Sequence, residues 1–368
     1  MLRYFVFLSL SAGLMPCCAL SSEVPALEHP VAFISLRHEH VQIFTTQGIG
    51  KEQALTKGQY NDMQPVWSPD GSHIAFSSVR DGVSAIYLLD LAQQATSRLH
   101  ATLDWQSSPS WSPDGRTIAF IASAPDQPGA AIHAVDVASG RLTVLAQDGY
   151  DKGPGAPVWS NDGKYLAFVG GHQDSRSSEI WLVASDGSGL TSISTTVSSR
   201  KKAQPALSPD GRYLAFIADM RGYSALIKAD LVTGDVINLT FEYPAAYETP
   251  RWSSDGSMLA FASSRDDPDK TRMDIFVMNA DGTAVRNLTQ HPGEDFNPQW
   301  MPDNQTIVFM SLRTGKAQLW AVHLPSQQSV RLTNNQFHDM DQVPQPASVL
   351  FLHTAASDLH GVMRHETD

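Results

Sequence analysis

The sequence predicts an all-β propeller, a ring of four-stranded sheets, and three observations predict it. First, the phrase Trp-Ser-Pro-Asp-Gly or a close variant occurs six times, beginning at Trp67, Trp111, Trp159, Leu207, Trp252 and Trp300. Second, successive copies begin 44, 48, 48, 45 and 48 residues apart, a period that is typical of propeller blades. Third, each copy is followed by short apolar segments separated by turn residues, as the strands of one blade require.

The phrase itself predicts a tight hairpin between the first and second strands of each blade. Proline presets φ at the second turn position, aspartate tolerates the third, and glycine accepts a positive φ at the fourth. Gly71 and its counterparts occupy that fourth position, which Asn304 takes in the last copy. The segments that follow, such as residues 74–76 and 259–261, are apolar at every position. They therefore predict second strands that are buried on both faces.

The outer half of each blade is predicted by two further segments. Third strands are expected at residues 86–89, 180–183, 275–278 and 319–322. Fourth strands are expected at residues 98–99, 142–145, 237–240, 286–289 and 331–333. Turns such as Asp186-Gly187 and Asp281-Gly282 separate some of these pairs, and such dipeptides favour hairpins.

The two ends of the repeat region predict how the ring closes. Residues 31–37, 41–44 and 53–56 read as a second, third and fourth strand without a first. Residues 341–346 resemble the first strand expected at 295–300. If they supply the missing strand, no open sheet edge remains between the first and last blades, and six full units plus one shared blade make seven. A six-bladed ring, with residues 349–352 paired elsewhere, is the alternative.

Composition limits the class of partner. The chain has 368 residues, with 26 Lys plus Arg against 38 Asp plus Glu and a formal net charge of -12. This balance argues against a nucleic-acid partner, because nucleic-acid binding depends on neutralising phosphates. An acidic protein is instead suited to basic partners.

The N-terminal segment is typical of a secretory signal. Arg3 precedes an apolar run over residues 4–15, which is too short to span a bilayer as a helix. We therefore expect a signal peptide at 1–21, a propeller at 22–352 and a C-terminal tail at 353–368. The expected product is a periplasmic or otherwise extracytoplasmic monomer without a membrane span. A lipid anchor on Cys17 is an alternative, although Pro16 directly before it fits such a signal poorly.

The repeats are similar to those of the TolB-type β-propeller family. Each is built on Pro-x-Trp-Ser-Pro-Asp-Gly-x-x-Ile-Ala-Phe, with Asn-Leu-Thr or Arg-Leu-Thr in the outer strand, and together they span about residues 31–346. The resemblance implies an extracytoplasmic scaffold that binds other proteins. It covers the propeller alone, because the N-terminal α/β domain of TolB has no counterpart. The wider group also includes peptidase propellers and oligogalacturonate lyases.

Motifs for catalysis are scarce in this sequence. It contains no Gly-x-Ser-x-Gly nucleophile elbow and no His-Glu-x-x-His zinc motif, and its 13 His residues fall at unlike positions in different repeats. We therefore predict no catalytic residue, no metal and no cofactor. The alternative is a metal-dependent carbohydrate-active enzyme resembling oligogalacturonate lyase. Such a site would need several histidines converging on the channel.

The candidate binding residues are expected around one mouth of the channel. Inner strands run alongside a propeller channel, so the segments that precede them rim one of its mouths. We predict binding by Asp62, Asp104, Trp105, Asp151, Lys202, Tyr247, Glu248, Asp295 and Asp341. A rim rich in carboxylates would attract a basic envelope protein or peptide. Tyr60, Trp105, Tyr150, Tyr243 and Tyr247 would supply aromatic anchors. The alternative is that these acids only keep the loops soluble.

Overall fold

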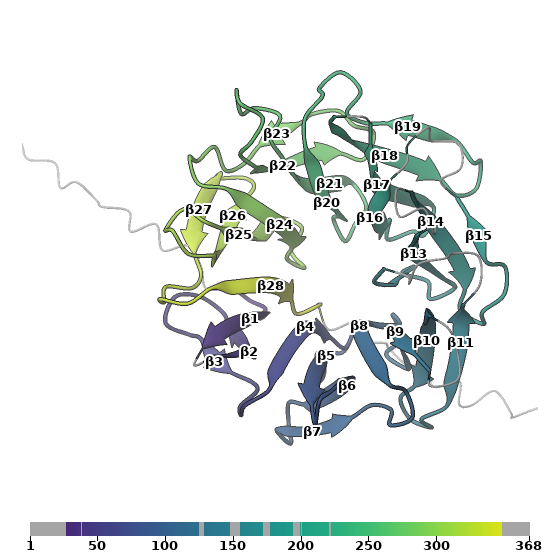
Figure 1. Ribbon diagram of the computed structural model, residues 1–368. Helices are drawn as coiled ribbons and strands as arrows, with labels where there is room; N and C mark the ends of the chain where they lie inside the picture. The colour runs from purple at the N-terminus through teal and green to yellow at the C-terminus, as the bar shows by residue number, and fades with distance from the viewer. Residues whose placement is uncertain are drawn as a thin grey trace, which may run out of the picture.

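A computed structural model describes residues 27–37, 39–124, 129–147, 155–171, 177–193, 199, 201–220 and 222–347. These residues form 28 strands in seven four-stranded antiparallel sheets, which are arranged as a ring around a central channel (Figure 1). The predicted seven-bladed propeller is confirmed. Within this part of the chain, no helix is long and apolar enough to cross a membrane.

Each blade runs outward from an inner strand, and blades 2 to 7 are continuous in sequence. Blade 2 consists of β4 (Asn61–Trp67), β5 (His73–Arg80), β6 (Val83–Asp90) and β7 (Ala95–Arg98). Blade 3 consists of β8 (Trp105–Trp111), β9 (Thr117–Ser123), β10 (Ala130–Asp136) and β11 (Leu142–Ala146). Blade 4 consists of β12 (Val158–Trp159), β13 (Tyr165–Gly171), β14 (Ser178–Ala184) and β15 (Thr191–Ser192).

The remaining three continuous blades follow the same order. Blade 5 consists of β16 (Lys202–Leu207), β17 (Tyr213–Asp219), β18 (Ser224–Asp230) and β19 (Val236–Asn238). Blade 6 consists of β20 (Tyr247–Trp252), β21 (Met258–Ser263), β22 (Asp274–Asn279) and β23 (Arg286–Asn287). Blade 7 consists of β24 (Asp295–Trp300), β25 (Thr306–Ser311), β26 (Gln318–His323) and β27 (Gln328–Arg331).

Blade 1 is shared by the two ends of the chain. It consists of β28 (Asp339–Pro344), β1 (Val31–Arg37), β2 (His40–Thr46) and β3 (Gln53–Ala54) in that order. The predicted closure of the ring by terminal strands is therefore confirmed. The predicted start of the closing strand is wrong by two residues, because β28 begins at Asp339 rather than at Asp341. Residues 349–352 of the six-bladed alternative lie outside the described residues.

The repeated turn is held by its own serine and aspartate. In blade 2, Ser68 Oγ donates to Asp70 Oδ1 at 2.6 Å, and the same oxygen accepts the backbone N–H of Ser72 at 3.0 Å. Gly71 closes the turn with a φ of 70°, which only glycine adopts at little cost. The same Ser Oγ–Asp Oδ1 bond recurs in blades 3 to 6, so the first strands of blades 2 to 6 are followed by the same reversal.

The core lies between the blades. Seven clusters of buried hydrophobic residues occupy the seven interfaces between neighbouring blades. The second strand of every blade contributes a phenylalanine that is at most 1% exposed: Phe33, Phe76, Phe120, Phe168, Phe216, Phe261 and Phe309. Each such burial stabilises the ring by about 1.5–3 kcal/mol.

Four tryptophans of the repeated phrase join their blade to the one before it. The indole N–H of Trp67 donates to the carbonyl of Val343, and that of Trp300 donates to the carbonyl of Arg251, both at 3.0 Å. Trp159 and Trp252 make the same contact. These side chains are thus structural and hold neighbouring inner strands together.

Candidate functional site

The channel has two chemically different mouths. Its wall is formed by the inner strands β4, β8, β12, β16, β20, β24 and β28 (Figure 1). We call the end at which these strands begin the strand-start mouth, and the end at which the Ser-Pro-Asp-Gly turns follow them the turn mouth. The sequence predicts all of its binding residues around the strand-start mouth or its loops.

Two of the predicted rim carboxylates are buried in ion pairs with arginines of their own blades. Asp295 is fully buried, and its carboxylate receives two N–H groups of Arg313, the shorter contact at 2.7 Å. Asp62 is 1% exposed and lies 3.7 Å from Arg80. Both arginines stand two residues after the strand position that pairs with the aspartate. These carboxylates are therefore not available to a partner.

Two further predicted residues at the same strand position are also buried. Lys202 is 1% exposed, and its Nζ contacts both carboxylate oxygens of Glu179 in the preceding blade at 2.8 Å. Tyr247 is fully buried, its hydroxyl donates to the carbonyl of Tyr243 at 2.7 Å, and burial raises the pKa of its phenol. Side chains at this strand position are therefore buried in the protein, where they bond to residues of the same blade or of the neighbouring blade.

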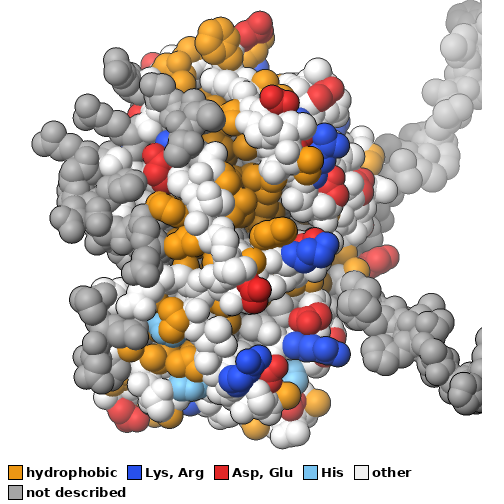
Figure 2. Space-filling view, turned by 90° about the vertical axis from the view of Figure 1, so that its right-hand side faces the viewer, with side chains coloured by type: hydrophobic (Ala, Val, Ile, Leu, Met, Phe, Trp, Pro, Cys, Tyr) orange, Lys and Arg blue, Asp and Glu red, His pale blue; other side chains and the backbone are white. Residues whose placement is uncertain are grey.

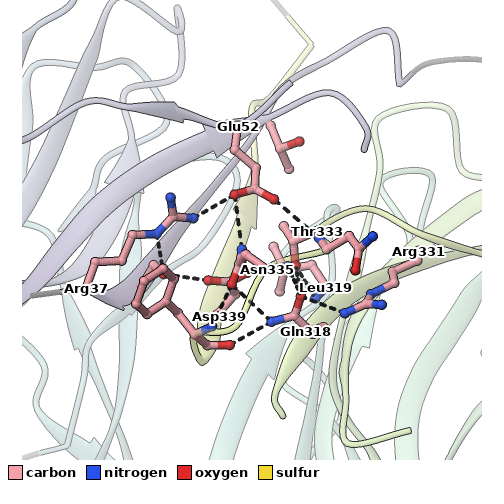
Figure 3. A network of polar contacts seen from close by, with 12 residues as sticks. Arg37, Glu52, Gln318, Leu319, Arg331, Thr333, Asn335 and Asp339 are labelled. Carbon is pink, nitrogen blue, oxygen red and sulfur yellow. Dashed lines mark hydrogen bonds and ion pairs between the residues drawn. The ribbon is translucent and has the colours of Figure 1, made fainter. Parts of the chain in front are cut away.

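The closing strand places a different aspartate at this position. Asp339 pairs with Ser35 across β28 and β1, as Asp295 pairs with Ser311 in blade 7. Asp339 is fully buried and accepts hydrogen bonds from Ser35 Oγ at 2.6 Å and Asn335 Nδ2 at 2.8 Å (Figure 3). Asp341 thus does not occupy the position that the sequence comparison assigned to it.

Arginine is paired differently in blade 1. Arg37 binds Glu52 at 2.7 Å rather than Asp339, and Glu52 in turn accepts a hydrogen bond from Asn335 at 3.1 Å (Figure 3). Neutral donors therefore hold Asp339, and burial raises the pKa of its carboxyl. The network links β1 and the segment after β2 to the loop before β28, so it fastens the two ends of the chain.

The remaining predicted residues are exposed. Trp105 is 42% exposed at the first position of β8, with Asp104 exposed beside it, and Glu248 is exposed on β20. Asp341 is exposed on the inner strand β28, where its φ is 51°, and desolvation by the surrounding strands raises the pKa of its carboxyl. Asp151 lies outside the described residues.

Two exposed apolar side chains at the strand-start mouth were missed by sequence reasoning, Met63 and Val83, each 36% exposed. Tyr60, an expected aromatic anchor, is 39% exposed, with the guanidinium of Arg80 4.7 Å from its ring centre. The start of β6 is tied to the start of β8, because Ser84 Oγ donates to the carbonyl of Gln106 at 2.8 Å. Val83 and Trp105 therefore belong to neighbouring segments of this mouth.

Exposure of an apolar side chain does not by itself mark a site. The outer wall near β11, β15 and β19 also carries hydrophobic side chains, which gather in the upper middle of that view (Figure 2). Val144 on β11 is 41% exposed and Ile237 on β19 is 51% exposed. The strand-start mouth differs in combining exposed aromatic rings with exposed carboxylates, Asp104 and Glu248.

The turn mouth contains a hollow. A cavity of about 1030 Å³ lies between blades 4 to 7 and the segment that follows β28. Its walls are largely apolar and include Trp159, Pro209, Trp300, Met301 and Pro346. The sequence analysis did not predict this cavity, because its candidate binding residues all belong to the other mouth.

No metal centre is found in the part of the chain that the structure describes. There, no three side chains of His, Cys, Asp or Glu lie close enough together to hold a metal ion. His133, for example, is buried against Phe120, and desolvation lowers the pKa of its imidazole.

Comparison with solved structures agrees with this architecture. An oligogalacturonate lyase in complex with manganese superposes with a TM-score of 0.66 at 20% identity, over 81% of this chain and 86% of that chain. TolB from Acinetobacter baumannii superposes with a TM-score of 0.55 at 18% identity, over 88% of this chain and 68% of that one. Similarity at this level of identity concerns the fold alone.

Curated relatives share only segments. A TolB homologue of Chlorobium luteolum is 31% identical over 80 residues, which is 22% of this chain and 17% of that protein. This chain matches at most 31% of the length of the curated relatives it resembles.

The family comparison covers nearly the whole described ring. The TolB beta propeller domain matches three overlapping stretches, residues 18–178, 126–269 and 172–367. These stretches contain the six repeated phrases and both terminal strands of blade 1. The resemblance found in the repeats is thereby confirmed, and the chain belongs to the TolB β-propeller domain family.

Proposed function

We propose that this protein is an exported, non-catalytic scaffold that binds an envelope protein or peptide at the strand-start mouth of its channel. The observation that carries the proposal is the contrast within that mouth. Asp62, Lys202 and Asp295 form buried ion pairs within the protein. Trp105 and Tyr60, by contrast, are exposed. Exposed aromatic side chains are the residues on which protein interfaces most often depend.

The exposed carboxylates favour a partner with basic groups. Asp104 and Glu248 are exposed beside this mouth and Asp341 within the inner wall, and the whole chain carries a formal net charge of -12. Such charges raise the association rate of an oppositely charged partner. In this proposal the four exposed predicted residues contact the partner, and the buried ones keep the mouth in shape.

Export and the chain's organisation belong to the same proposal. An apolar segment preceded by Arg3 supports a signal peptide over residues 1–21, followed by the propeller at 22–352 and a tail at 353–368. Likeness to TolB supports a periplasmic location and a protein partner. A monomer is consistent with a ring that closes by pairing β28 with β1 of the same chain.

Site-directed photo-crosslinking in intact cells tests the proposal. A photoreactive phenylalanine analogue is placed at Trp105, and, as a matched control, at Val144 on the outer wall, because the two side chains are 42% and 41% exposed. We expect a discrete crosslinked product from position 105 only. Equal products from both positions, or none from position 105, would contradict the proposal.

A second candidate is a metal-dependent carbohydrate-active enzyme. It is favoured by the TM-score of 0.66 with an oligogalacturonate lyase in complex with manganese. The purified protein is assayed for manganese by elemental analysis and for cleavage of oligogalacturonate with added manganese. Stoichiometric metal together with cleavage would favour the enzyme over the scaffold.

A further inference from the structure

An arginine at the turn mouth breaks the pattern of the repeat. The residue directly before the Trp or Leu of each repeated phrase is uncharged in five copies: Val66, Ser110, Val158, Ala206 and Gln299. Val343 takes the matching place in β28, next to the strand's last residue. Only blade 6 carries a charged residue there, Arg251 on β20. Nothing in the turn or in the packing of the blade requires a charge at this position.

Arg251 has no acidic partner among the described residues. Arg251 lines the cavity of about 1030 Å³, and no Asp or Glu lines that cavity. One of its N–H groups donates to the carbonyl of Pro250 at 2.9 Å, whereas a guanidinium has five such donors. Arg80, Arg272 and Arg313, by contrast, each form an ion pair with an aspartate.

The surroundings of Arg251 make an uncompensated charge costly. Desolvation by the surrounding protein lowers the pKa of its guanidinium. Arg251 is part-buried, and a cation partly removed from water is stabilised when an anion or several acceptors replace the lost hydration. The free donors of Arg251 are therefore suited to an oxyanion, which an arginine binds with two parallel hydrogen bonds.

The rest of the cavity is suited to an apolar ligand body. Trp159 and Trp300 line it, and their indole N–H groups are already bonded to the backbone carbonyls of Ser110 and Arg251. Pro209, Pro302 and Pro346 add further apolar wall. Small-molecule sites are concave, mostly apolar and equipped with a few polar groups that fix orientation, with volumes of roughly 300–1000 Å³.

We propose that the turn mouth binds a small organic carboxylate, with its carboxylate on Arg251 and its apolar body against Trp159 and Trp300. This site lies at the opposite end of the channel from the strand-start mouth, and its ligand has the opposite charge preference to the proposed protein partner. It is thus a second binding function and does not depend on the first.

Competition between a matched pair of ligands tests the site on the full chain. The fluorescent anion 1-anilinonaphthalene-8-sulfonate reports occupancy, and octanoate or its uncharged analogue octanamide is used to displace it. We expect one equivalent of the dye to bind, and octanoate to displace it at a concentration at least about tenfold lower than octanamide. Equal displacement by the two ligands, or no dye binding, overturns the proposal.

Variants locate the site. Arg251→Met is expected to weaken dye binding at least about tenfold and to leave binding of uncharged N-phenyl-1-naphthylamine unchanged. Arg98→Met on the exposed strand β7 is the matched control and is expected to bind like wild type. Wild-type dye affinity in Arg251→Met overturns the proposal. Should that variant fail to fold, Arg251→Lys replaces the planar guanidinium with a single compact charge. We expect Arg251→Lys to weaken the binding of octanoate more than the binding of octanamide. Equal effects on the two ligands overturn the proposal.

The strand-start mouth supplies the independent control. Trp105→Ala is expected to leave dye binding and octanoate displacement unchanged, because Trp105 does not line this cavity. If Trp105→Ala loses the crosslinked partner but still binds octanoate, the two sites are independent. A failure of one proposal can then be told from a failure of the other.

Discussion

The two mouths of the channel use charge in opposite ways. At the strand-start mouth, Asp295 is fully buried and is neutralised by Arg313 at 2.7 Å. At the turn mouth, Arg251 lies against an apolar cavity without an acidic partner among the described residues. A buried pair fixes the scaffold, whereas a part-buried unpaired charge is suited to binding a ligand. The number of charged residues near a mouth therefore does not predict a binding site unless the partners of those residues are known.

The largest effect is expected when a pair at the strand-start mouth is broken. Arg313→Met leaves Asp295 buried without its counter-ion, which costs about 3–5 kcal/mol of the free energy of unfolding. Urea denaturation followed by fluorescence measures this loss. Arg251→Met, which removes an unpaired cation, is expected to be neutral or stabilising in the same assay.

A surface pair provides the control for that comparison. Lys164 and Asp162 are 3.0 Å apart with side chains 71% and 39% exposed. Lys164→Met is therefore expected to cost no more than about 1 kcal/mol. If Arg313→Met and Arg251→Met destabilise the protein equally, the distinction between the two mouths is wrong.

An intermediate effect is expected from glycines at the two mouths. Gly71 has a φ of +70°, and a Cβ there would lie 2.3 Å from Gln345 Nε2, whereas Gly82 has a φ of +77° with nothing within 4 Å. Backbone strain is expected to cost about 1–2 kcal/mol at either position. Gly71→Ala also displaces Gln345, whose N–H bonds to the carbonyl of Pro30 at 2.9 Å.

Thermal unfolding of the two alanine variants checks this difference. Gly71→Ala is expected to lower Tm further than Gly82→Ala, because only Gly71 contacts the segment that follows the closing strand. The reverse order would show that Gln345 does not support the turn mouth.

A smaller effect is expected from the aspartate that lacks an arginine. Burial raises the pKa of Asp339 above its usual 3.8, so its ionised form is disfavoured in the folded state. The stabilising contribution is then fully present below the unfolded pKa, near 4, and is lost as pH rises through the folded pKa. The difference in unfolding free energy between wild type and Asp339→Asn is expected to shift against wild type as pH rises from about 4 to 7.

Urea denaturation at several pH values measures this shift. A difference between wild type and Asp339→Asn that is constant over this range would contradict the raised pKa of Asp339.

The fold was predictable because its signals are local and repeated. The turn phrase and the apolar second strand each predict a hairpin, and the six copies predict the same hairpin geometry. The register of the closing strand was not predictable, because β28 lacks both the tryptophan and the turn phrase. Asp339 and Asp341 both lie in this segment, and only pairing with Ser35 distinguishes them.

The candidate site was only partly predictable. Neighbouring residues of a strand face opposite sides, so Trp105 is exposed while Gln106 is fully buried. A signal for the buried aspartates was present in the arginines that follow the second strands, such as Arg80 and Arg313. Arg251 could have been found by aligning the repeats, as the charged residue at an otherwise uncharged position.

The most direct test of the account compares an exposed and a buried residue of the strand-start mouth. Trp105→Ala and Asp62→Asn are introduced separately, and a photoreactive residue at position 63, where Met63 is 36% exposed, reports partner capture in intact cells. The account predicts that Trp105→Ala abolishes the crosslinked product while Asp62→Asn, if folded, retains it. Loss with Asp62→Asn and retention with Trp105→Ala would contradict it.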